Sequence, residues 1–284
     1  MKRRAIIINI IRYLILTAVM LVVFVPLAYT ILSAFKTNTE IMTHPEALIP
    51  INPTLDNFKQ AIVNQEFSVP KMFWNSVWYS AISVLMSILV GTLTGYVFAR
   101  GGNFPGSKVI FAVQSSLMFI NLGSITIYAV FEVLNLLHLA DSLYGLLIKK
   151  FFAMNMIGTY LVRSYIKTLP QSLDEAAEID GCSFIGIFFK IILPLLKPIV
   201  ATLVVMSFNG SWNEYLMPTL FTINRPDQQT LIVGIMRLKN SGSAAANWNL
   251  MFAGAAIALA PVLVIYAFCN KYFVEGLAAG AVKG

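Results

Sequence analysis

The chain has 284 residues, of which 58% are hydrophobic and only 12% are charged, and its mean hydropathy is +0.75. Soluble domains carry about 25% charged residues, so this composition indicates a polytopic membrane protein and excludes a soluble globular one. The net charge is +7, but the Lys and Arg residues are scattered or flank apolar runs, which makes them topology signals and argues against nucleic-acid binding.

Six apolar segments are long enough to be membrane-spanning helices, because a span needs roughly 20 apolar residues. They cover residues 9–35, 75–99, 109–136, 142–163, 198–222 and 250–273. The first is longer than the apolar core of a signal peptide and has no obvious small-residue cleavage site, so we read it as a retained span. No strand pattern, internal repeat or separate soluble domain stands out. We therefore expect residues 1–284 to form one all-α transmembrane domain.

Small residues recur along one face of the second span. Ser83, Ser87, Gly91 and Gly95 are each four residues apart, and the two glycines form a GxxxG pair. Such pairs let two helices approach closely in a membrane. The neighbouring helix could belong to this chain or to a second subunit, and the sequence leaves both alternatives open.

Basic flanking residues predict the orientation, because Lys and Arg are enriched on the cytoplasmic side of a membrane. The residues in question are Lys2, Arg3, Arg4, Arg12, Arg100, Lys108, Arg163, Lys167, Lys190, Lys197, Lys271 and Lys283. Placing all of them inside leaves both termini and the loop 167–197 in the cytoplasm. The loops 36–74, 137–141 and 223–249 then lie outside.

The predicted cytoplasmic loop concentrates acidic residues just before another apolar run. Four of the thirteen acids of the chain lie within seven residues, namely Asp174, Glu175, Glu178 and Asp180. Ser172 followed three residues later by Glu175 predicts a capping box. Gly181 can adopt the left-handed conformation that ends a helix. We therefore expect a short helix over residues 173–180 and a second amphipathic segment over 184–193.

Two interpretations fit this loop. A solvated acidic loop explains the acids, but it does not explain Ala176 and Ala177 followed by the glycine stop. Small side chains and a sharp turn are typical of a helix that docks into a groove of another protein. The docking interpretation therefore accounts for more of the residues.

The stretch 173–198 resembles the EAA motif of ABC importer permeases. The matching positions are Glu175, Ala176, Ala177, Gly181, Ile191, Leu193 and Pro194, in the order and spacing of that motif. The segments 31–41, 73–100, 211–221 and 272–284 are similar to the carbohydrate-uptake branch of the family, of the maltose-permease second-subunit type. The resemblance implies a type I ABC importer transmembrane domain with six helices. It further implies the import of sugars or oligosaccharides across a bacterial cytoplasmic membrane.

The resemblance also implies partners and residue roles. In that family the loop is a coupling helix that sits in a cleft of the ATP-binding subunit. The residues expected at this contact are Asp174, Glu175, Ala176, Ala177, Glu178, Asp180, Gly181, Ile191, Leu193 and Pro194. The implied partners are a second homologous permease subunit, two ATP-binding subunits and an extracytoplasmic solute-binding protein. ATP and Mg²⁺ would bind the partner, and no G-x-x-x-x-G-K-[ST] motif occurs in this chain.

Four polar residues inside spans are candidates for the translocation path. Asn213 and Glu214 lie in the fifth span, where a polar pair either lines a water-filled path or joins two helices. Lys149 and Lys150 lie in the fourth span, at a point where the family pattern is mostly apolar. In one interpretation one lysine snorkels outward and the other pairs with Glu132 or Asp141. In the other, at least one lysine faces the path and attracts an anionic substrate such as a uronic-acid-containing oligosaccharide.

Some features outside the spans complete the expectations. The outer loop 240–251 is either a mobile linker or a contact with the binding protein, and its candidate contact residues are Ser241, Gly242, Ser243 and Trp248. His44 and His138 lie in separate outer loops, so we expect surface residues and no metal site.

A secondary transporter or channel is the alternative function, and it would require an ion path of intramembrane acids. The sequence has no converging acid–base cluster of the kind that would predict an enzyme.

Overall fold

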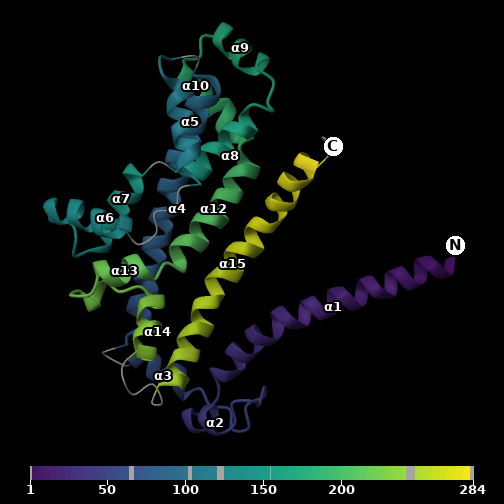
Figure 1. Cartoon of the computed structure of the whole chain (residues 1–284), viewed down its shortest axis with the longest axis vertical. Coiled ribbons are helices and arrows are strands. Elements are labelled where there is room, and N and C mark those ends of the chain that lie inside the picture. Colours follow the sequence, from purple (N-terminus) through teal and green to yellow (C-terminus); the bar gives the residue numbers. More distant parts are fainter. Residues whose placement is uncertain are drawn as a thin grey trace. The chain divides into compact units, whose positions relative to one another are not determined.

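The computed structural model of the chain is helical wherever it has regular structure, within a described part that comprises residues 2–63, 67–101, 104–119, 125–153, 155–240 and 247–281 (Figure 1). The helices are α1 (Lys2–Ser33), α2 (Asn38–Thr43), α3 (Asp56–Val63), α4 (Val69–Arg100), α5 (Ser107–Leu117), α6 (Ile125–Leu136), α7 (Leu143–Phe152), α8 (Met156–Ile166), α9 (Ser172–Ile179), α10 (Phe184–Ile187), the π-helix η1 (Phe188–Ile192), α11 (Leu193–Leu195), α12 (Lys197–Trp212), α13 (Leu216–Phe221), the 3₁₀-helix η2 (Pro226–Gln228), α14 (Leu231–Asn240) and α15 (Trp248–Ala281). The all-α prediction is confirmed.

Length and hydropathy identify four helical segments that can cross a membrane. They are Ile8–Ser33, Val69–Arg100, Leu143–Ile166 and Trp248–Cys269, and they correspond to the first, second, fourth and sixth predicted spans. The helices Phe184–Leu195 and Lys197–Trp212 qualify as one further span, although they are bent by 79° at the break between them. Pro198 is at the start of α12 and lacks a backbone N–H, which favours a break at this point.

The predicted third and fifth spans are not continuous helices. The third, 109–136, is divided into α5 and α6, and α5 ends where the N–H groups of Met118 and Phe119 bond to the carbonyls three residues back. Such bonds tighten the last turn of a helix and do not continue it. The fifth, 198–222, is interrupted at residues 213–215, between α12 and α13. Helices therefore end inside these two predicted spans, and the bounds of the spans stay a prediction.

The chain forms two compact units. Unit 1 comprises residues 1–73 and 231–260, and unit 2 comprises residues 74–230 and 261–284. In unit 1, α3, α14 and the first turns of α4 and α15 share one core, whose buried members are Ala61, Phe67, Val69, Met72, Leu231, Ile235, Leu250 and Ala258. Asn57 joins α3 to the end of α1, because its amide donates to the carbonyls of Ala34 and Lys36, both at 2.8 Å.

Unit 2 has two cores, one toward each end. The first contains Tyr96, Val162, Ile166, Ala177, Ile187, Phe188, Ile192, Leu196 and Leu203. The second contains Tyr79, Leu134, Ala140, Leu143, Leu146, Leu147 and Phe221. Within this unit, α9 and α10 lie at one end, and α6, α7 and α13 lie toward the other (Figure 1). Helix α4 contributes Tyr96 to one core and Tyr79 to the other, so it connects the two ends.

The small-residue face of α4 packs against α8 of the same chain. A Cβ atom added to Gly95 would lie 2.6 Å from the Cβ atom of Val162, which is far inside the contact distance. A Cβ atom added to Gly91 would lie 3.5 Å from the backbone of Gly158. The two glycines therefore permit close helix packing, and of the two alternatives left open by the sequence this contact is the one within the chain.

Candidate functional site

The predicted short helix in the acidic loop exists as α9, but it begins without the predicted capping box. Its N-cap is Gln171 and not Ser172, and no side chain caps it. The backbone of Gln171 is already helical, with φ −70° and ψ −24°, and its carbonyl accepts the N–H groups of Asp174 and Glu175. The helix thus starts one residue earlier than predicted, and Ser172 is placed inside the first turn, where it cannot act as the cap.

Gly181 ends α9 as predicted. Its φ is +78°, and the N–H groups of Gly181 and Cys182 donate to the carbonyls of Glu178 and Ala177, at 3.0 and 2.9 Å. This pair of bonds is the Schellman arrangement, which satisfies carbonyls that the end of a helix leaves free. A Cβ atom at Gly181 would meet nothing within 4 Å, so the left-handed backbone alone calls for glycine here.

The inner face of α9 is fixed to the rest of unit 2. Ala177 is buried in the core that also contains Tyr96 and Ile166. The carboxylate of Asp174 lies 2.9 Å from Nε of Arg100, the last residue of α4, and both side chains are only 11% exposed. Nη2 of Arg100 also donates to the carbonyl of Leu169 at 2.9 Å. The Arg100–Asp174 ion pair therefore ties α9 to the end of α4.

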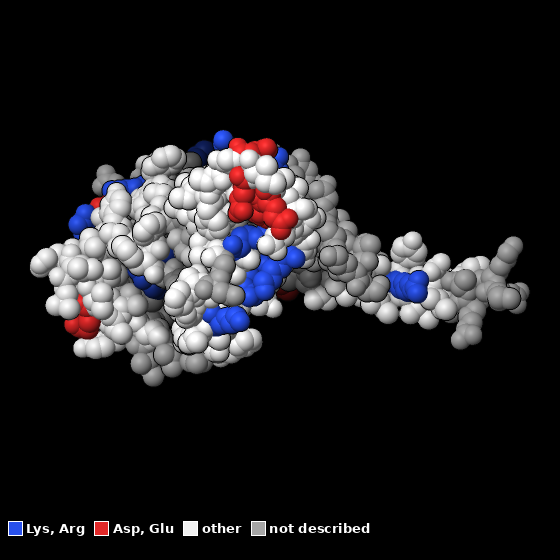
Figure 2. All heavy atoms as spheres, turned by 90° about the horizontal axis from the view of Figure 1, so that it is seen from above, with Lys and Arg blue, Asp and Glu red and all other residues white. Residues whose placement is uncertain are grey.

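The outer face of α9 is open to the surroundings. Its exposed residues include Glu175, Ala176, Glu178, Ile179 and the C-cap Asp180. Ile179 is 88% exposed, an uncommon fraction for a large apolar side chain on an otherwise acidic surface. Acidic side chains gather at the α9 end of unit 2, with basic side chains beside them (Figure 2). This face combines charge and apolar contact area, as protein-binding surfaces do.

The second segment of the EAA stretch packs inward and contains a π-helix. Helix α10 continues into η1, where the N–H of Leu193 donates to the carbonyl of Phe188, and then into α11 with Pro194. Phe188 and Ile192 are buried, and Ile191 and Leu193 pack against the same core while half-buried. Pro194 is exposed. Ile191 and Leu193 thus pack this segment against the helices of unit 2, whereas Glu175, Glu178 and Asp180 face outward.

A polar pocket lies deeper in unit 2. Its volume is about 420 Å³, and its polar lining residues are Ser83, Ser87, Lys149, Lys150, Asn155, Ser207, Ser211 and Glu214. Nζ of Lys150 lies 2.7 Å from Oε2 of Glu214 and 3.3 Å from the hydroxyl oxygens of Ser83 and Ser211. Tyr79 donates to the same carboxylate oxygen at 2.8 Å, and its ring lies 4.5 Å from Nζ of Lys150.

The pocket joins some predicted path residues and not others. Glu214, Lys149 and Lys150 line it, but Asn213 does not, because its amide donates to the carbonyl and side chain of Asn209 on an exposed surface. The predicted pairing of a lysine with Glu132 or Asp141 was wrong. Lys150 pairs with Glu214, since the interruption after α12 brings that carboxylate to the end of α7.

Residues that the sequence did not identify complete this pocket. Tyr79 extends the four-residue spacing of Ser83 and Ser87 by one turn, and Ser207 and Ser211 repeat the same spacing on α12. The hydroxyl groups of Ser87 and Ser207 lie 2.6 Å apart. A search for polar residues spaced by four in facing apolar helices could have found this set, because residues i and i+4 share one helix face.

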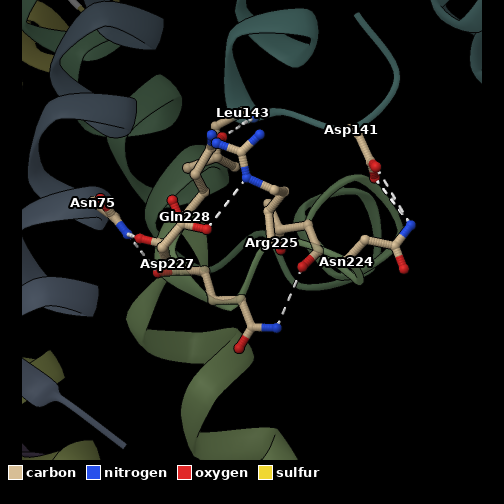
Figure 3. A network of polar contacts seen from close by, with 9 residues as sticks. Asn75, Asp141, Leu143, Asn224, Arg225, Asp227 and Gln228 are labelled. Atoms are coloured by element: carbon tan, nitrogen blue, oxygen red, sulfur yellow. Dashed lines mark hydrogen bonds and ion pairs between the residues drawn. The ribbon is translucent and has the colours of Figure 1, made fainter. Parts of the chain in front are cut away.

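At the opposite end of unit 2, a polar network holds the segment that follows α13 (Figure 3). The amide of Asn75 donates to the carbonyls of Asp227 and Gln229, at 2.9 and 3.0 Å. The side chain of Gln228 accepts the N–H of Leu143 at the start of α7, at 3.2 Å. This segment leads toward the predicted binding-protein contact.

Part of that predicted contact lies outside the described residues, namely Ser241, Gly242 and Ser243. Trp248 is half-buried at the start of α15, and its ring lies 6.3 Å from that of Phe252. The contact role of the outer loop stays a prediction. His44 and His138 are both exposed, as predicted for surface residues.

Comparison with known proteins agrees with these features. Residues 87–278 match the family of the binding-protein-dependent transport system inner membrane component. An arabinooligosaccharide transport system permease of Halalkalibacterium halodurans is 32% identical over 91% of each chain. A galactooligosaccharide transport system permease of Bacillus subtilis is 32% identical over 96% of this chain and 94% of that one.

The fold also has a counterpart among solved structures. A bacterial ABC transporter that imports the acidic polysaccharide alginate contains a chain that superposes with a TM-score of 0.78, at 22% identity, over 94% of this chain and 96% of that one. The family match covers more than half of the chain and includes α9, the stretch up to Pro194 and every lining residue of the polar pocket except Ser83. This protein belongs to the family of binding-protein-dependent transport system inner membrane components of ABC importers.

Proposed function

We propose that this chain is the membrane-spanning permease subunit of an ATP-driven, binding-protein-dependent importer of oligosaccharides. The observation that carries the proposal is the two-sided construction of α9. Its inner face is held by Ala177 and by the Arg100–Asp174 ion pair, and its outer face exposes Glu175, Glu178 and Ile179. A helix that is rigidly attached on one side and open on the other can transmit the movement of a partner to the helices behind it.

The partner at α9 is the ATP-binding subunit in this proposal. The chain itself lacks the glycine-rich phosphate loop, so hydrolysis takes place on that separate subunit, where ATP and Mg²⁺ bind. Of the ten residues assigned to the contact, Asp174 and Ala177 act from inside by positioning α9. The exposed acidic residues and Ile179 make the contact itself.

The other partners follow from the family. A second homologous permease subunit completes the path, two ATP-binding subunits bind the cytoplasmic side, and an extracytoplasmic solute-binding protein delivers the sugar. The α9 end is cytoplasmic, because Arg100, Lys108, Arg163 and Lys167 all lie at this end of unit 2. Both termini are then cytoplasmic as well, in a bacterial cytoplasmic membrane.

The substrate class rests on the relatives and on the polar pocket. Two relatives with 32% identity carry oligosaccharides by name. The pocket presents four serine hydroxyls and the amide of Asn155, and sugars need such hydrogen-bond partners along a path. Lys149, Lys150 and Glu214 together give the pocket a net charge of +1, so acidic oligosaccharides are accepted there as well as neutral ones.

Site-specific cross-linking tests the contact at α9. In a chain whose Cys182 and Cys269 are replaced by serine, we expect Ile179→Cys to cross-link to the ATP-binding subunit through a short bifunctional reagent. The control is Ile223→Cys, a residue that is 65% exposed and follows α13 at the other end of unit 2. Equal cross-linking from both positions, or from neither in assembled transporters, would overturn the assignment of α9.

A further inference from the structure

A second pocket in unit 2 has a different chemistry from the polar pocket. Its volume is about 370 Å³, and it lies where three helices end or begin: α4 contributes Phe98, α5 contributes Ser107, Lys108 and Phe111, and α8 and its C-cap contribute Arg163 and Lys167. Neither the oligosaccharide path nor the contact of α9 uses it.

Three cations converge on this pocket without an acidic counterpart. Arg163 is held in place, because its Nε donates to the carbonyl of Phe98 at 3.2 Å and its guanidinium carbon lies 3.9 Å from the ring centroid of Phe111. Lys108 and Lys167 are exposed. None of the three forms an ion pair within the part of the chain that the structure describes. Three like charges around one cavity repel one another, and an anion in the cavity would relieve that repulsion.

The start of α5 also favours an anion in this pocket. Ser107 is the first helical residue, and its N-cap Gly106 has a φ of +81° and supplies no side-chain cap. The N–H groups of Ser107 and Ile110 donate to the carbonyls of Phe104 and Gly106, so in the first turn of α5 the N–H groups of Lys108 and Val109 are the donors that the helix itself does not use. Helix N-termini favour phosphate groups through these donors and through the helix dipole.

The position of the pocket identifies the source of the anion. Helix α4 ends at Arg100, α5 begins at Ser107 and α8 ends at Ile166, so the pocket lies at the level where spans leave the membrane. Along α5, the apolar residues Val109, Val113 and Leu117 form one face and are 66%, 54% and 46% exposed. Their four-residue spacing makes a continuous apolar strip that begins next to Lys108.

We infer that this pocket binds the phosphate of an anionic glycerophospholipid, with the acyl chains along Val109, Val113 and Leu117. Basic pockets between membrane helices on the cytoplasmic side are suited to such headgroups. Free inorganic phosphate shares the chemistry of the headgroup but would gain nothing from the apolar strip. The site would couple the lipid to α8, whose C-terminal end leads through Pro170 into α9.

The test compares lipid binding by the full chain in its purified transporter. Native mass spectrometry with phosphatidylglycerol is expected to show a roughly thirty-fold loss of affinity in the Lys108→Gln, Lys167→Gln double variant, since each lysine near a membrane surface contributes a factor of about five to six. The control is the Lys190→Gln, Lys197→Gln double variant, which removes the same charge from exposed lysines that do not line the pocket. Equal losses in the two double variants would overturn the site.

A second experiment uses the wild-type chain and distinguishes a lipid phosphate from free inorganic phosphate. Amine acetylation of the wild-type chain in the presence of phosphatidylglycerol vesicles should spare Lys108 and Lys167 but modify Lys190 and Lys197. Phosphatidylcholine vesicles should give no such protection. If millimolar inorganic phosphate alone protects Lys108 and Lys167 as well as phosphatidylglycerol does, the site binds a free anion and the lipid assignment is refuted. Failure of these experiments would leave the transport function untouched.

Discussion

The Lys150–Glu214 ion pair is the residue-scale feature with the largest consequence for transport. It joins the end of α7 to the interruption after α12, with Nζ and Oε2 2.7 Å apart and the two side chains 24% and 22% exposed. An unpaired lysine at the centre of a span costs about 2.5–3.5 kcal/mol on insertion scales. Pairing reduces that cost, and it leaves Lys149 as the source of the net positive charge of the polar pocket.

A double-mutant cycle tests the energetic coupling of this pair. Glu214→Gln and Lys150→Met should each lower the free energy of unfolding by about 1–3 kcal/mol, because each leaves a largely buried charge without its partner. The double variant should lose clearly less than the sum of the two single losses. Thermal unfolding in detergent, followed by circular dichroism, gives the three values.

Arg225→Gln is the matched control for this cycle. Arg225 pairs with Asp227 at 3.3 Å, but both side chains are 48% exposed. Exposed ion pairs contribute only about 0.2–1 kcal/mol, so this variant should change stability little. Strictly additive effects of Glu214→Gln and Lys150→Met would show that the two side chains are not coupled.

Gly181 gives a second prediction at this scale. Gly181→Val should reduce co-purification of the ATP-binding subunit roughly tenfold or more while the chain remains inserted, because a left-handed backbone costs a non-glycine residue about 1–2 kcal/mol or more. Asn tolerates this conformation, so Gly181→Asn should retain most of the binding. Equal binding by the two variants would mean that the φ of +78° is not needed for the contact.

The sequence allowed the role of Gly181 to be predicted but not the partner of Lys150. A helix stop depends on a few neighbouring residues, so the acidic helix followed by glycine was sufficient evidence. The lysine lies in α7, and its partner lies 64 residues further along the chain, in the interruption after α12. Their contact depends on where α7 and α12 end and how they pack. The spacing of residues within one span cannot predict this.

At the scale of elements, α9 illustrates how a predicted contact residue can have an internal role. Asp174 belongs to the acidic cluster, and nothing in the residue pattern distinguishes it from Glu175 and Glu178. In the structure it faces inward and meets Arg100, because α4 ends beside the first turn of α9. The burial of Asp174 and Ala177, three residues apart, marks the inner face of the helix.

Removing this ion pair should loosen α9 without changing its outer face. We expect Asp174→Ala to increase the amide hydrogen exchange of residues 172–180 and to uncouple ATP hydrolysis from uptake, because Arg100 loses its charged partner. For the exchange measurement Glu178→Ala is the control, since Glu178 lies on the exposed face and makes no ion pair among the described residues. Unchanged exchange in Asp174→Ala would contradict the positioning role.

The membrane-spanning elements were predicted with uneven success for a physical reason. Continuous apolar runs such as α1 and α4 depend on hydropathy alone, and the C-terminal ends of both were predicted to within two residues, although both helices begin six or seven residues earlier than predicted. The ends of α5 and α12 fall inside the predicted third and fifth spans. The break after α12 coincides with the polar residues Asn213 and Glu214, but a polar pair inside a span can equally lie within an unbroken helix, so the sequence did not reveal the interruption.

At the scale of the whole molecule, the described features of unit 2 fall into an order that suits transport. The α9 face and the basic pocket lie at one end, the polar pocket lies between the two cores, and the Asn75 network holds the segment after α13 at the other end. Helix α4 contributes a residue to each of three sites: Arg100 to the ion pair with α9, Ser83 to the polar pocket and Asn75 to the network at the other end. Movement at α9 can therefore reach the polar pocket along one continuous helix.

Oligosaccharide uptake by reconstituted transporters tests the central claim most directly. Proteoliposomes containing this chain, its permease partner and the ATP-binding subunits should take up the oligosaccharide only with ATP at the α9 side and binding protein at the other. Gly181→Val should abolish uptake while the amount of inserted chain stays normal. Uptake by this chain alone, driven by an ion gradient and independent of ATP, would contradict the account and identify a secondary transporter.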